Sequence, residues 1–259
     1  MKFNFIDTDR YPPRALASPS KKLVAYWTPK AGCSLMAKMF LIYIGNYDNH
    51  LSPIYQRDLY TQQQLKNHNE RQYLCNQNDS FYEDYVKIQM VRNPYDRAVA
   101  SFIKYLHIAK NRITLSFQSY LELILFGNSV IDPSEKTFIE HHFLPQYMTS
   151  KLDHVIKMEN ITQDLYELHK KYDILLKYTA QEVEPSYQTQ FYNPEITHKC
   201  SCEQFRFTDN GLQNMNSKQI GVPRYELFYN QYCKNMVGKI YAKDIEYFDY
   251  DFPYKNLAL

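Results

Sequence analysis

The sequence is short of net charge and of long apolar runs, and each shortage excludes a class of protein. Over 259 residues, 30 Lys and Arg nearly balance 28 Asp and Glu, which leaves a formal charge of +2 at pH 7. Nucleic-acid-binding proteins usually carry a clear basic excess, so we expect no nucleic-acid partner. The nearest approach to an apolar run, residues 35–44, contains Lys38 and is much shorter than a membrane span of about 18 residues. We therefore expect no membrane span.

The number of cysteines is odd, and the first residues do not predict a secretory leader. The five cysteines are an odd number in a chain of ordinary size and do not predict a disulfide framework. Residues 1–7 lack the long apolar run and the small-residue cleavage site of a secretory signal. These features predict a reduced, cytoplasmic protein. The segment His-Lys-Cys-Ser-Cys at 198–202 is too closely spaced for an ordinary zinc site, so we expect no metal.

Glycine is scarce as well, with 6 residues in the whole chain. Average usage is roughly 7%, so each glycine marks a position where backbone freedom was hard to replace. What the chain does have is 44% hydrophobic residues, enough for a sizeable core, without an internal repeat or a low-complexity linker. Residues 1–20 are polar and contain prolines, which predicts an N-terminal arm. Residues 21–259 are expected to form one domain.

Strand-like and helix-like segments alternate along that domain. Asn93 suits a helix N-cap with Pro94 at the first helical position, and Asn160 with Gln163 predicts a capping box. Residues 180–222 are polar and are expected to form irregular loops. The predicted strands are 22–27, 86–91 and 154–158, and the predicted helices include 35–43, 94–107, 116–126, 160–172 and 235–248. This alternation predicts an α/β fold with a parallel sheet, whose ligands bind at the carboxyl ends of the strands.

The loop after the first predicted strand has the composition of an anion-binding site. It reads Pro-Lys-Ala-Gly-Cys-Ser at residues 29–34. Lys30 would supply a full charge, Gly32 would let the backbone turn close to a ligand, and Ser34 would begin a helix whose N–H groups face outward. The spacing of Lys30, Gly32 and Ser34 differs from the Gly-x-x-x-x-Gly-Lys-Ser/Thr pattern of P-loop nucleoside triphosphatases. An ordinary surface turn with a solvated lysine remains the alternative.

A second candidate follows the next predicted strand. Arg92 stands at the strand end and can bind a phosphate through two hydrogen bonds. Ser101 lies further along the following helix and can add a hydroxyl donor. We expect Arg97 to pair with an acidic neighbour instead of a ligand. Together, the two candidates predict a ligand with two separate anionic groups.

With these motifs, the chain resembles the sulfotransferases that use 3′-phosphoadenylyl sulfate (PAPS), especially the carbohydrate branch that includes the chondroitin 4-O and heparan 2-O enzymes. In that family, a Pro-Lys-x-Gly/Ala-Cys/Ser-Ser/Thr loop binds the 5′-phosphosulfate and an Arg-Asp/Asn-Pro-x-x-Arg-x-x-Ser segment binds the 3′-phosphate. The resemblance rests on ordered segments at 29–34, 92–101, 142–146 (His-Phe-Leu-Pro-Gln), 152–161 and 241–250. It implies a P-loop-kinase-like sulfotransferase fold: one α/β domain with a central parallel sheet flanked by helices.

The resemblance also implies the roles of the site residues. Lys30 would stabilise the leaving 3′,5′-adenosine bisphosphate (PAP), and Arg92 would bind the 3′-phosphate. The family serine falls at Ala100 here, so Ser101 would reach that phosphate only if the helix start is shifted. Arg224 would close over the nucleotide. The remaining residues implied in phosphosulfate binding are Pro29, Ala31, Gly32, Cys33 and Ser34.

A base is also needed for the acceptor hydroxyl, which we expect on a carbohydrate. The family match implies His142, with the adjacent His141 as the other candidate and Glu159 as a weaker one. Two other functions stay open. A P-loop-like small-molecule kinase would depend on magnesium, and a catalytically degenerate nucleotide- or sugar-binding module would bind PAP without turnover.

Overall fold

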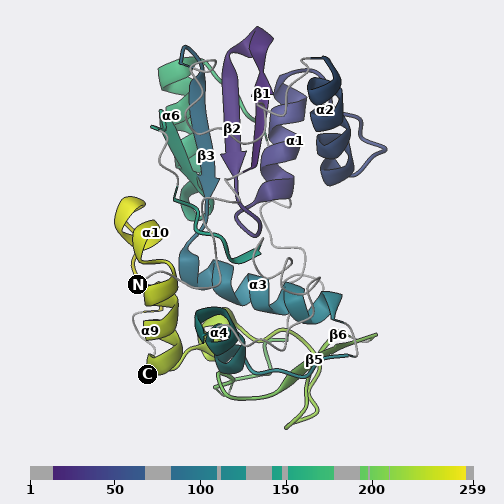
Figure 1. Cartoon of the computed structure of the whole chain (residues 1–259), viewed down its shortest axis with the longest axis vertical. Helices are drawn as coiled ribbons and strands as arrows, with labels where there is room; N and C mark the ends of the chain where they lie inside the picture. The colour runs from purple at the N-terminus through teal and green to yellow at the C-terminus, as the bar shows by residue number, and fades with distance from the viewer. Residues whose placement is uncertain are drawn as a thin grey trace. The chain divides into compact units, whose positions relative to one another are not determined.

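The structure is a computed structural model that describes residues 14–67, 83–109, 112–126, 142–147, 151–177, 193–197, 199–209 and 211–254. Its contacts divide the chain into two compact units that are interleaved in sequence (Figure 1). Unit 1 contains Asn93–Pro145 and Glu184–Leu259, and unit 2 contains Thr8–Arg92 and Gln146–Val183. A single domain over residues 21–259 stays a prediction.

Unit 2 is built, within the described residues, on a four-stranded sheet in the order β1-β2-β3-β4. The strands β2, β3 and β4 are parallel, and β1 pairs antiparallel with β2 at the edge (Figure 1). The α/β class and a central, largely parallel sheet flanked by helices are thereby confirmed, as are the three predicted strands. The strands are β1 (Arg14–Ser18), β2 (Leu23–Trp27), β3 (Val86–Val91) and β4 (His154–Lys157).

The strand β1 corrects the last part of the arm predicted over residues 1–20, of which residues 1–13 lie outside the described residues. Residues 14–18 pair with all of β2 through a tight turn at η1 (Pro19–Lys21). Alternate side chains of a strand face opposite sides of a sheet, and both sides are covered here. Leu16 lies in the larger core, while Ala15 and Ala17 pack with Val24 in a second cluster. The flanking polar residues and prolines hid this short apolar run.

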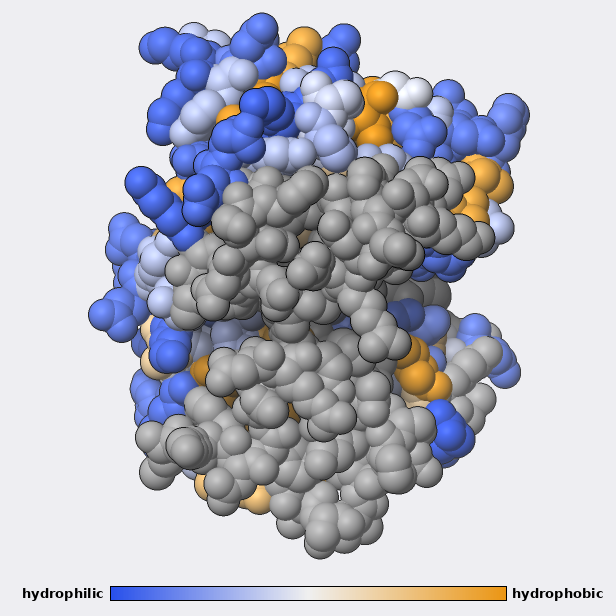
Figure 2. Space-filling view, turned by 45° about the horizontal axis from the view of Figure 1, so that its top comes forward, coloured by the Kyte–Doolittle hydropathy of each residue, from blue (hydrophilic) through white to orange (hydrophobic). Residues whose placement is uncertain are grey.

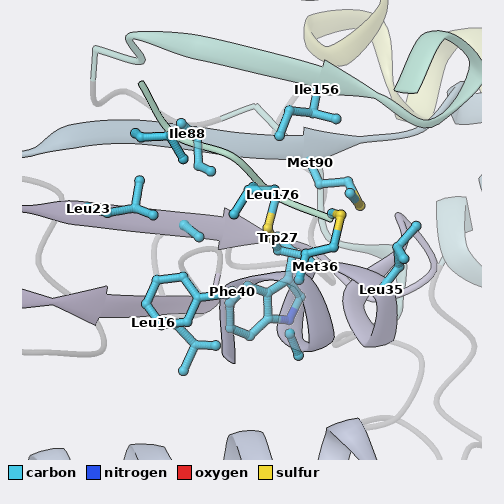
Figure 3. Close-up of a cluster of buried hydrophobic side chains, with 14 of the residues drawn as sticks. Leu16, Leu23, Trp27, Leu35, Met36, Phe40, Ile88, Met90, Ile156 and Leu176 are labelled. Atoms are coloured by element: carbon cyan, nitrogen blue, oxygen red, sulfur yellow. The ribbon is translucent and has the colours of Figure 1, made fainter. Parts of the chain in front are cut away.

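Helices pack on this sheet through one hydrophobic core. Trp27 of β2, Phe40 of α1 and Ile88 of β3 are buried together in it (Figure 3). Leu165 and Leu168 of α6 face the same core, as their helical spacing predicts. Burial of this apolar surface, at about 25 cal/mol per Å², stabilises the packing of the helices on the sheet. The helical elements of unit 2 are α1 (Cys33–Tyr43), α2 (Pro53–Asn67), η4 (Met158–Asn160) and α6 (Ile161–Tyr172).

The capping box predicted at the start of α6 is wrong. Asn160 makes no side-chain cap bond, because its φ of −122° and ψ of 22° are not the extended conformation of an N-cap. Gln163 instead donates to Glu167, one turn further along the helix surface. The carboxylate of Asp164 accepts from the backbone N–H of Lys157 and so joins this helix to the end of β4.

Unit 1 has a core made largely of aromatic rings. Phe102 of α3 contacts Phe117 and Tyr120 of α4, and it also contacts Phe205 and Phe228. These edge-on and tilted contacts suit the charge distribution of aromatic rings. The elements are α3 (Pro94–Ile108), α4 (Phe117–Phe126), β5 (Phe205–Thr208), β6 (Gly211–Asn214), η5 (Tyr225–Phe228), α9 (Gln231–Ile240) and α10 (Ala242–Tyr247).

Two predictions for unit 1 need correction. The hairpin β5-β6 lies where irregular loops were expected over residues 180–222. The helix expected at 235–248 begins at Gln231, capped by Asn230, and breaks at Tyr241 into α9 and α10. The buried side chain of α10 is Asp244, which places a charge in the core of the unit.

The cap of α3 allows a test of helix-end energetics. The Asn93 side chain accepts from the backbone N–H of Tyr95 at 3.0 Å and donates to the carbonyl of Asp251 at 2.9 Å. We expect Asn93→Ala to lower the free energy of unfolding by about 1–2 kcal/mol. Asn160→Ala is the matched control, since it removes an exposed asparagine without a cap bond, and its expected cost is below about 0.5 kcal/mol. Equal losses in urea denaturation would contradict this.

Candidate functional site

The two predicted anion-binding segments leave adjacent parallel strands of unit 2. Trp27 of β2 lies opposite Met90 of β3 in the parallel register. Lys30 follows Trp27 after a short loop, and Arg92 follows β3 directly. Both therefore emerge at the carboxyl edge of the sheet, where ligands of open α/β sheets bind.

The loop at residues 29–34 turns sharply before α1. The backbone N–H of Ala31 donates to the carbonyl of Thr28 at 3.2 Å, and both Lys30 and Gly32 have left-handed φ angles, of 68° and 80°. The Lys30 side chain is half-buried and Ser34 is exposed. The first turn of α1 contains no acidic residue, so nothing there offsets the positive end of the helix dipole.

Gly32 packs against two methionines that sequence reasoning did not assign to the site. A Cβ at this position would lie 2.5 Å from Sδ of Met158, and closer still to Sδ of Met90. The loop therefore rests directly on β3 and on the residue after β4. The sequence signal was indirect: Met90 and Met158 each fall at the carboxyl end of a predicted strand.

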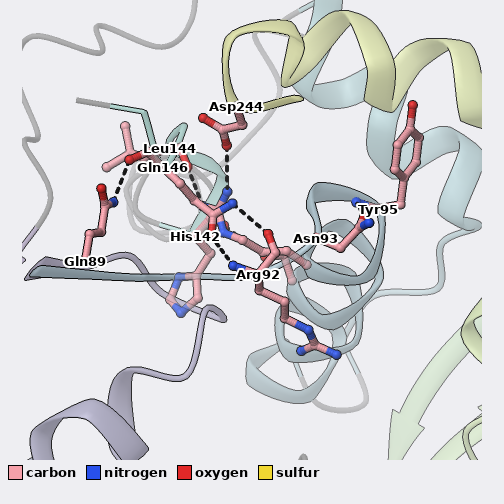
Figure 4. A network of polar contacts seen from close by, with 10 residues as sticks. Gln89, Arg92, Asn93, Tyr95, His142, Leu144, Gln146 and Asp244 are labelled. Carbon is pink, nitrogen blue, oxygen red and sulfur yellow. Dashed lines mark hydrogen bonds and ion pairs between the residues drawn. The ribbon is translucent and has the colours of Figure 1, made fainter. Parts of the chain in front are cut away.

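Arg92 is held by its backbone. Its N–H donates to Oε1 of Gln146 at 2.8 Å, and its carbonyl accepts from Nε2 of the same side chain at 2.8 Å (Figure 4). The Arg92 side chain is half-buried and extends away from this double contact (Figure 4). The backbone of Gln146 is held in turn by Gln89 of β3, whose Nε2 donates to its carbonyl at 2.6 Å.

In unit 1, the segment around His142 is anchored to α3. The hydroxyl of Ser101 donates to the carbonyl of His142 at 2.9 Å, and Arg97 donates to the carbonyls of His142 and Leu144. Phe143 is fully buried, with its ring stacked on Tyr241. The peptide that carries the predicted base is therefore fixed, while the His142 side chain is half-buried.

The Ser101 hydroxyl, predicted at the 3′-phosphate, has a partner within the protein. The helix begins at Pro94 as predicted, so its start is not shifted. One residue turns a helix by about 100°, and Ser101 accordingly points inward, with no exposed surface, while Ala100 at the family position is half-buried. Ser101 supports the backbone of His142 instead.

A family model described as the sulfotransferase family matches residues 13–251. This match covers nearly the whole chain, including both predicted anion-binding segments and the His142 segment. The chain belongs to the sulfotransferase family. It is accordingly a transferase of sulfuryl groups. Searches of the curated proteins and of the solved structures gave no match.

The segment 241–250 of this sulfotransferase also holds α3 in place. Arg97 and Asp244 are both fully buried, and their charged groups are 3.7 Å apart. The Arg97 guanidinium also lies over the ring of Tyr241, 5.2 Å from its centroid. Burial raises the pKa of Tyr241, so its hydroxyl stays neutral beside the ion pair. The prediction that Arg97 pairs with an acidic residue is confirmed.

Three other predicted site residues are exposed or lie outside the described residues. Arg224 precedes η5 and forms an ion pair with Glu226 at 3.1 Å, with about half of its side chain exposed. Glu159 is exposed in η4 of unit 2. His141 lies outside the described residues. None of these placements tests a catalytic or nucleotide-binding role.

Two cysteines of the sulfotransferase are buried, and its described surface is mostly hydrophilic. Burial raises the pKa of Cys200 and of Cys233 to about 12, so both thiols are protonated at neutral pH. Among the described residues, there is no group of three or more His, Cys, Asp or Glu that could hold a metal. No described helix combines the length and apolar character of a membrane span. The described surface in Figure 2 is mostly hydrophilic, with hydrophobic residues in small separate groups.

Proposed function

We propose that this sulfotransferase transfers the sulfuryl group of PAPS to a hydroxyl of a saccharide and releases PAP. One observation carries the proposal: the Lys30 loop and Arg92 emerge at the same edge from adjacent parallel strands of one unit. Two basic points on one sheet edge suit a ligand with two separate anionic groups. PAPS has such groups, a 5′-phosphosulfate and a 3′-phosphate.

The residues of the loop fit the phosphosulfate end of such a ligand. Gly32 keeps the backbone open, since its left-handed φ and the two methionines beneath it exclude a side chain. Backbone donors at the positive end of α1 then come from the amides of Gly32, Cys33 and Ser34, which follow Pro29 and Ala31 in the same loop. Lys30 neutralises negative charge that develops on the leaving group, as preorganised cations do in phosphoryl transfer. When bound, PAPS supplies an activated sulfuryl group.

Arg92 binds the 3′-phosphate in this proposal. A guanidinium can donate two parallel hydrogen bonds to a phosphate, and such charge-assisted bonds are stronger than neutral ones. The support is its position after β3 and the two hydrogen bonds that Gln146 makes with its backbone. Arg224 is a further proposed nucleotide contact, and its half-exposed guanidinium is compatible with that role.

The base that takes the proton of the acceptor hydroxyl is His142 in this proposal. Imidazoles change charge near neutral pH and are the commonest general bases. The fixed peptide around His142 supports the assignment, because a base must be held in one orientation. His141 and Glu159 are the other proposed candidates. The saccharide acceptor is supported by the likeness of residues 142–146 to the carbohydrate branch of the family.

The nucleotide part of the proposal is tested by calorimetric titration with PAP in EDTA. We expect metal-independent binding by the wild type. Arg92→Ala should weaken it by about 10- to 100-fold, the value of a charged hydrogen-bond pair. Ser101→Ala is the matched control and should leave PAP affinity unchanged, because that hydroxyl is turned toward His142.

Three outcomes would overturn the assignment. Binding of ATP with magnesium, without binding of PAP, would favour a kinase. PAP binding without release of PAP from PAPS, in the presence of a panel of saccharides, would favour a binding module. An Arg92→Ala variant with wild-type affinity would remove Arg92 from the phosphate site.

A further inference from the structure

Two fully buried glutamines lie next to each other in unit 2, and neither belongs to the sites described by the family motifs for the nucleotide. Gln89 is in the centre of β3, where its neighbours Ile88 and Met90 are buried apolar residues. Gln146 follows the His142 segment in sequence and is also fully buried. Burying amide groups costs free energy unless they are hydrogen-bonded. The hydrogen bonds of the two glutamines therefore indicate their structural role.

Gln146 bonds both backbone groups of Arg92. Its Oε1 accepts from the Arg92 N–H at 2.8 Å and its Nε2 donates to the Arg92 carbonyl at 2.8 Å (Figure 4). Arg92 lies one residue beyond β3, so the strand ladder no longer supplies partners for these groups. A primary amide carries both a donor and an acceptor and can satisfy both.

Gln89 makes this contact rigid from the sheet side. Its Nε2 donates to the backbone carbonyl of Gln146 at 2.6 Å. The Gln146 side chain is thus tied to Arg92 and its main chain is tied to β3, the strand that delivers Arg92. The hydrogen bonds from Gln89 to Gln146 and between Gln146 and Arg92 close a loop with the chain segment from Gln89 to Arg92, within one unit.

We infer that Gln146 is a positioning residue for nucleotide binding: it fixes the backbone of Arg92, supported by Gln89, and thereby sets where the guanidinium meets the 3′-phosphate. The inference rests on the proposed role of Arg92 and adds a residue that acts through it. Loss of the Gln146 amide removes both hydrogen bonds to the Arg92 backbone at the end of β3. The Arg92 side chain is then held less firmly and binds a phosphate less well. Small displacements of this kind have large effects on binding and catalysis.

The chain offers a closely matched control in Gln56. Its Oε1 accepts from the backbone N–H of Asp48 at 2.6 Å and its Nε2 donates to the carbonyl of the same residue at 2.7 Å. Gln56 is also buried, and it lies in the same unit. It therefore forms the same two-way contact with a backbone that carries no proposed ligand.

The test compares Gln146→Leu with Gln56→Leu in full-length protein by PAP calorimetry and thermal unfolding. Both variants should lower Tm. Gln146→Leu should also weaken PAP binding by about tenfold or more, while Gln56→Leu should stay within about twofold of wild type. In an Arg92→Ala background, Gln146→Leu should have no further effect on PAP affinity, because it acts through Arg92.

The outcomes separate this inference from the proposed function. Wild-type PAP affinity in Gln146→Leu, equal losses in both glutamine variants, or an undiminished effect in the Arg92→Ala background would each overturn the positioning role. If Gln146→Leu does not fold, Gln146→Asn replaces it, since it keeps the amide but shortens its reach, and the same weakening of PAP binding is expected. If wild-type protein does not bind PAP, the proposed function fails and the positioning role falls with it. Loss of PAP binding in Arg92→Ala alone would keep the function and reject the positioning role.

Discussion

Lys30→Gly is expected to make this sulfotransferase slower while leaving it at least as stable. Loss of the ammonium removes a charge that stabilises the leaving PAP, and removal of one such preorganised group typically lowers kcat by about 100- to 1,000-fold. The backbone effect has the opposite sign. Lys30 has a φ of 68°, and a residue with a Cβ pays about 1 kcal/mol in that region, which glycine does not.

The two effects are measured separately. The rate is that of PAP release from PAPS with saccharide acceptors, and stability is the free energy of unfolding in urea. Lys38→Ala is the control, because it removes a lysine of α1 in the same unit, and its kcat should stay within about twofold of wild type. A Lys30→Gly variant that keeps its rate to within about tenfold would remove Lys30 from the catalytic residues.

Gly32→Ala should cost both stability and nucleotide binding. The new Cβ would meet the sulfurs of Met90 and Met158 at less than contact distance, 2.5 Å in the case of Met158. It would also occupy a left-handed backbone, with a φ of 80°. Overpacking and strain together are expected to lower the free energy of unfolding by about 2–4 kcal/mol. PAP binding should weaken, because either the loop or the two methionine side chains beneath it must shift to relieve the clash.

Gly45→Ala separates the two causes. Gly45 has a similar φ of 74°, but a Cβ there would meet nothing within 4 Å. Its expected cost is therefore the backbone strain alone, about 1 kcal/mol, with PAP affinity unchanged. Equal losses of stability in the two alanine variants would show that the methionines do not confine the loop.

The local parts of the fold were readable from the sequence. The strands 22–27, 86–91 and 154–158 followed from short apolar runs, and the start of α3 followed from Asn93 and Pro94. The placement of Lys30 and Arg92 at one sheet edge followed as well, because Arg92 comes directly after one parallel strand and Lys30 comes a short loop after its neighbour. The errors in predicted secondary structure arose where local sequence signals conflict. The strand at residues 14–18 was missed because its neighbours are polar, and Asn160 is a residue type that can cap a helix but makes no cap bond here.

The contacts made by the site residues depended on the tertiary structure. Arg97 needed an acidic partner, and nothing local identified Asp244 as that partner. Ser101 has a helical phase that turns it inward, but only packing shows that its hydroxyl meets the carbonyl of His142.

The sequence by itself determined the α/β class, the parallel strands and the two basic segments that follow them, since these rest on hydrophobic periodicity and on residues within a few positions of each other. Only the tertiary structure decided what surrounds those segments: the methionines under Gly32 and the amide of Gln146 on the backbone of Arg92. The physical reason is distance along the chain. Arg92 and Gln146 are 54 residues apart, so their contact comes from packing of whole elements and leaves no periodic signal in either segment.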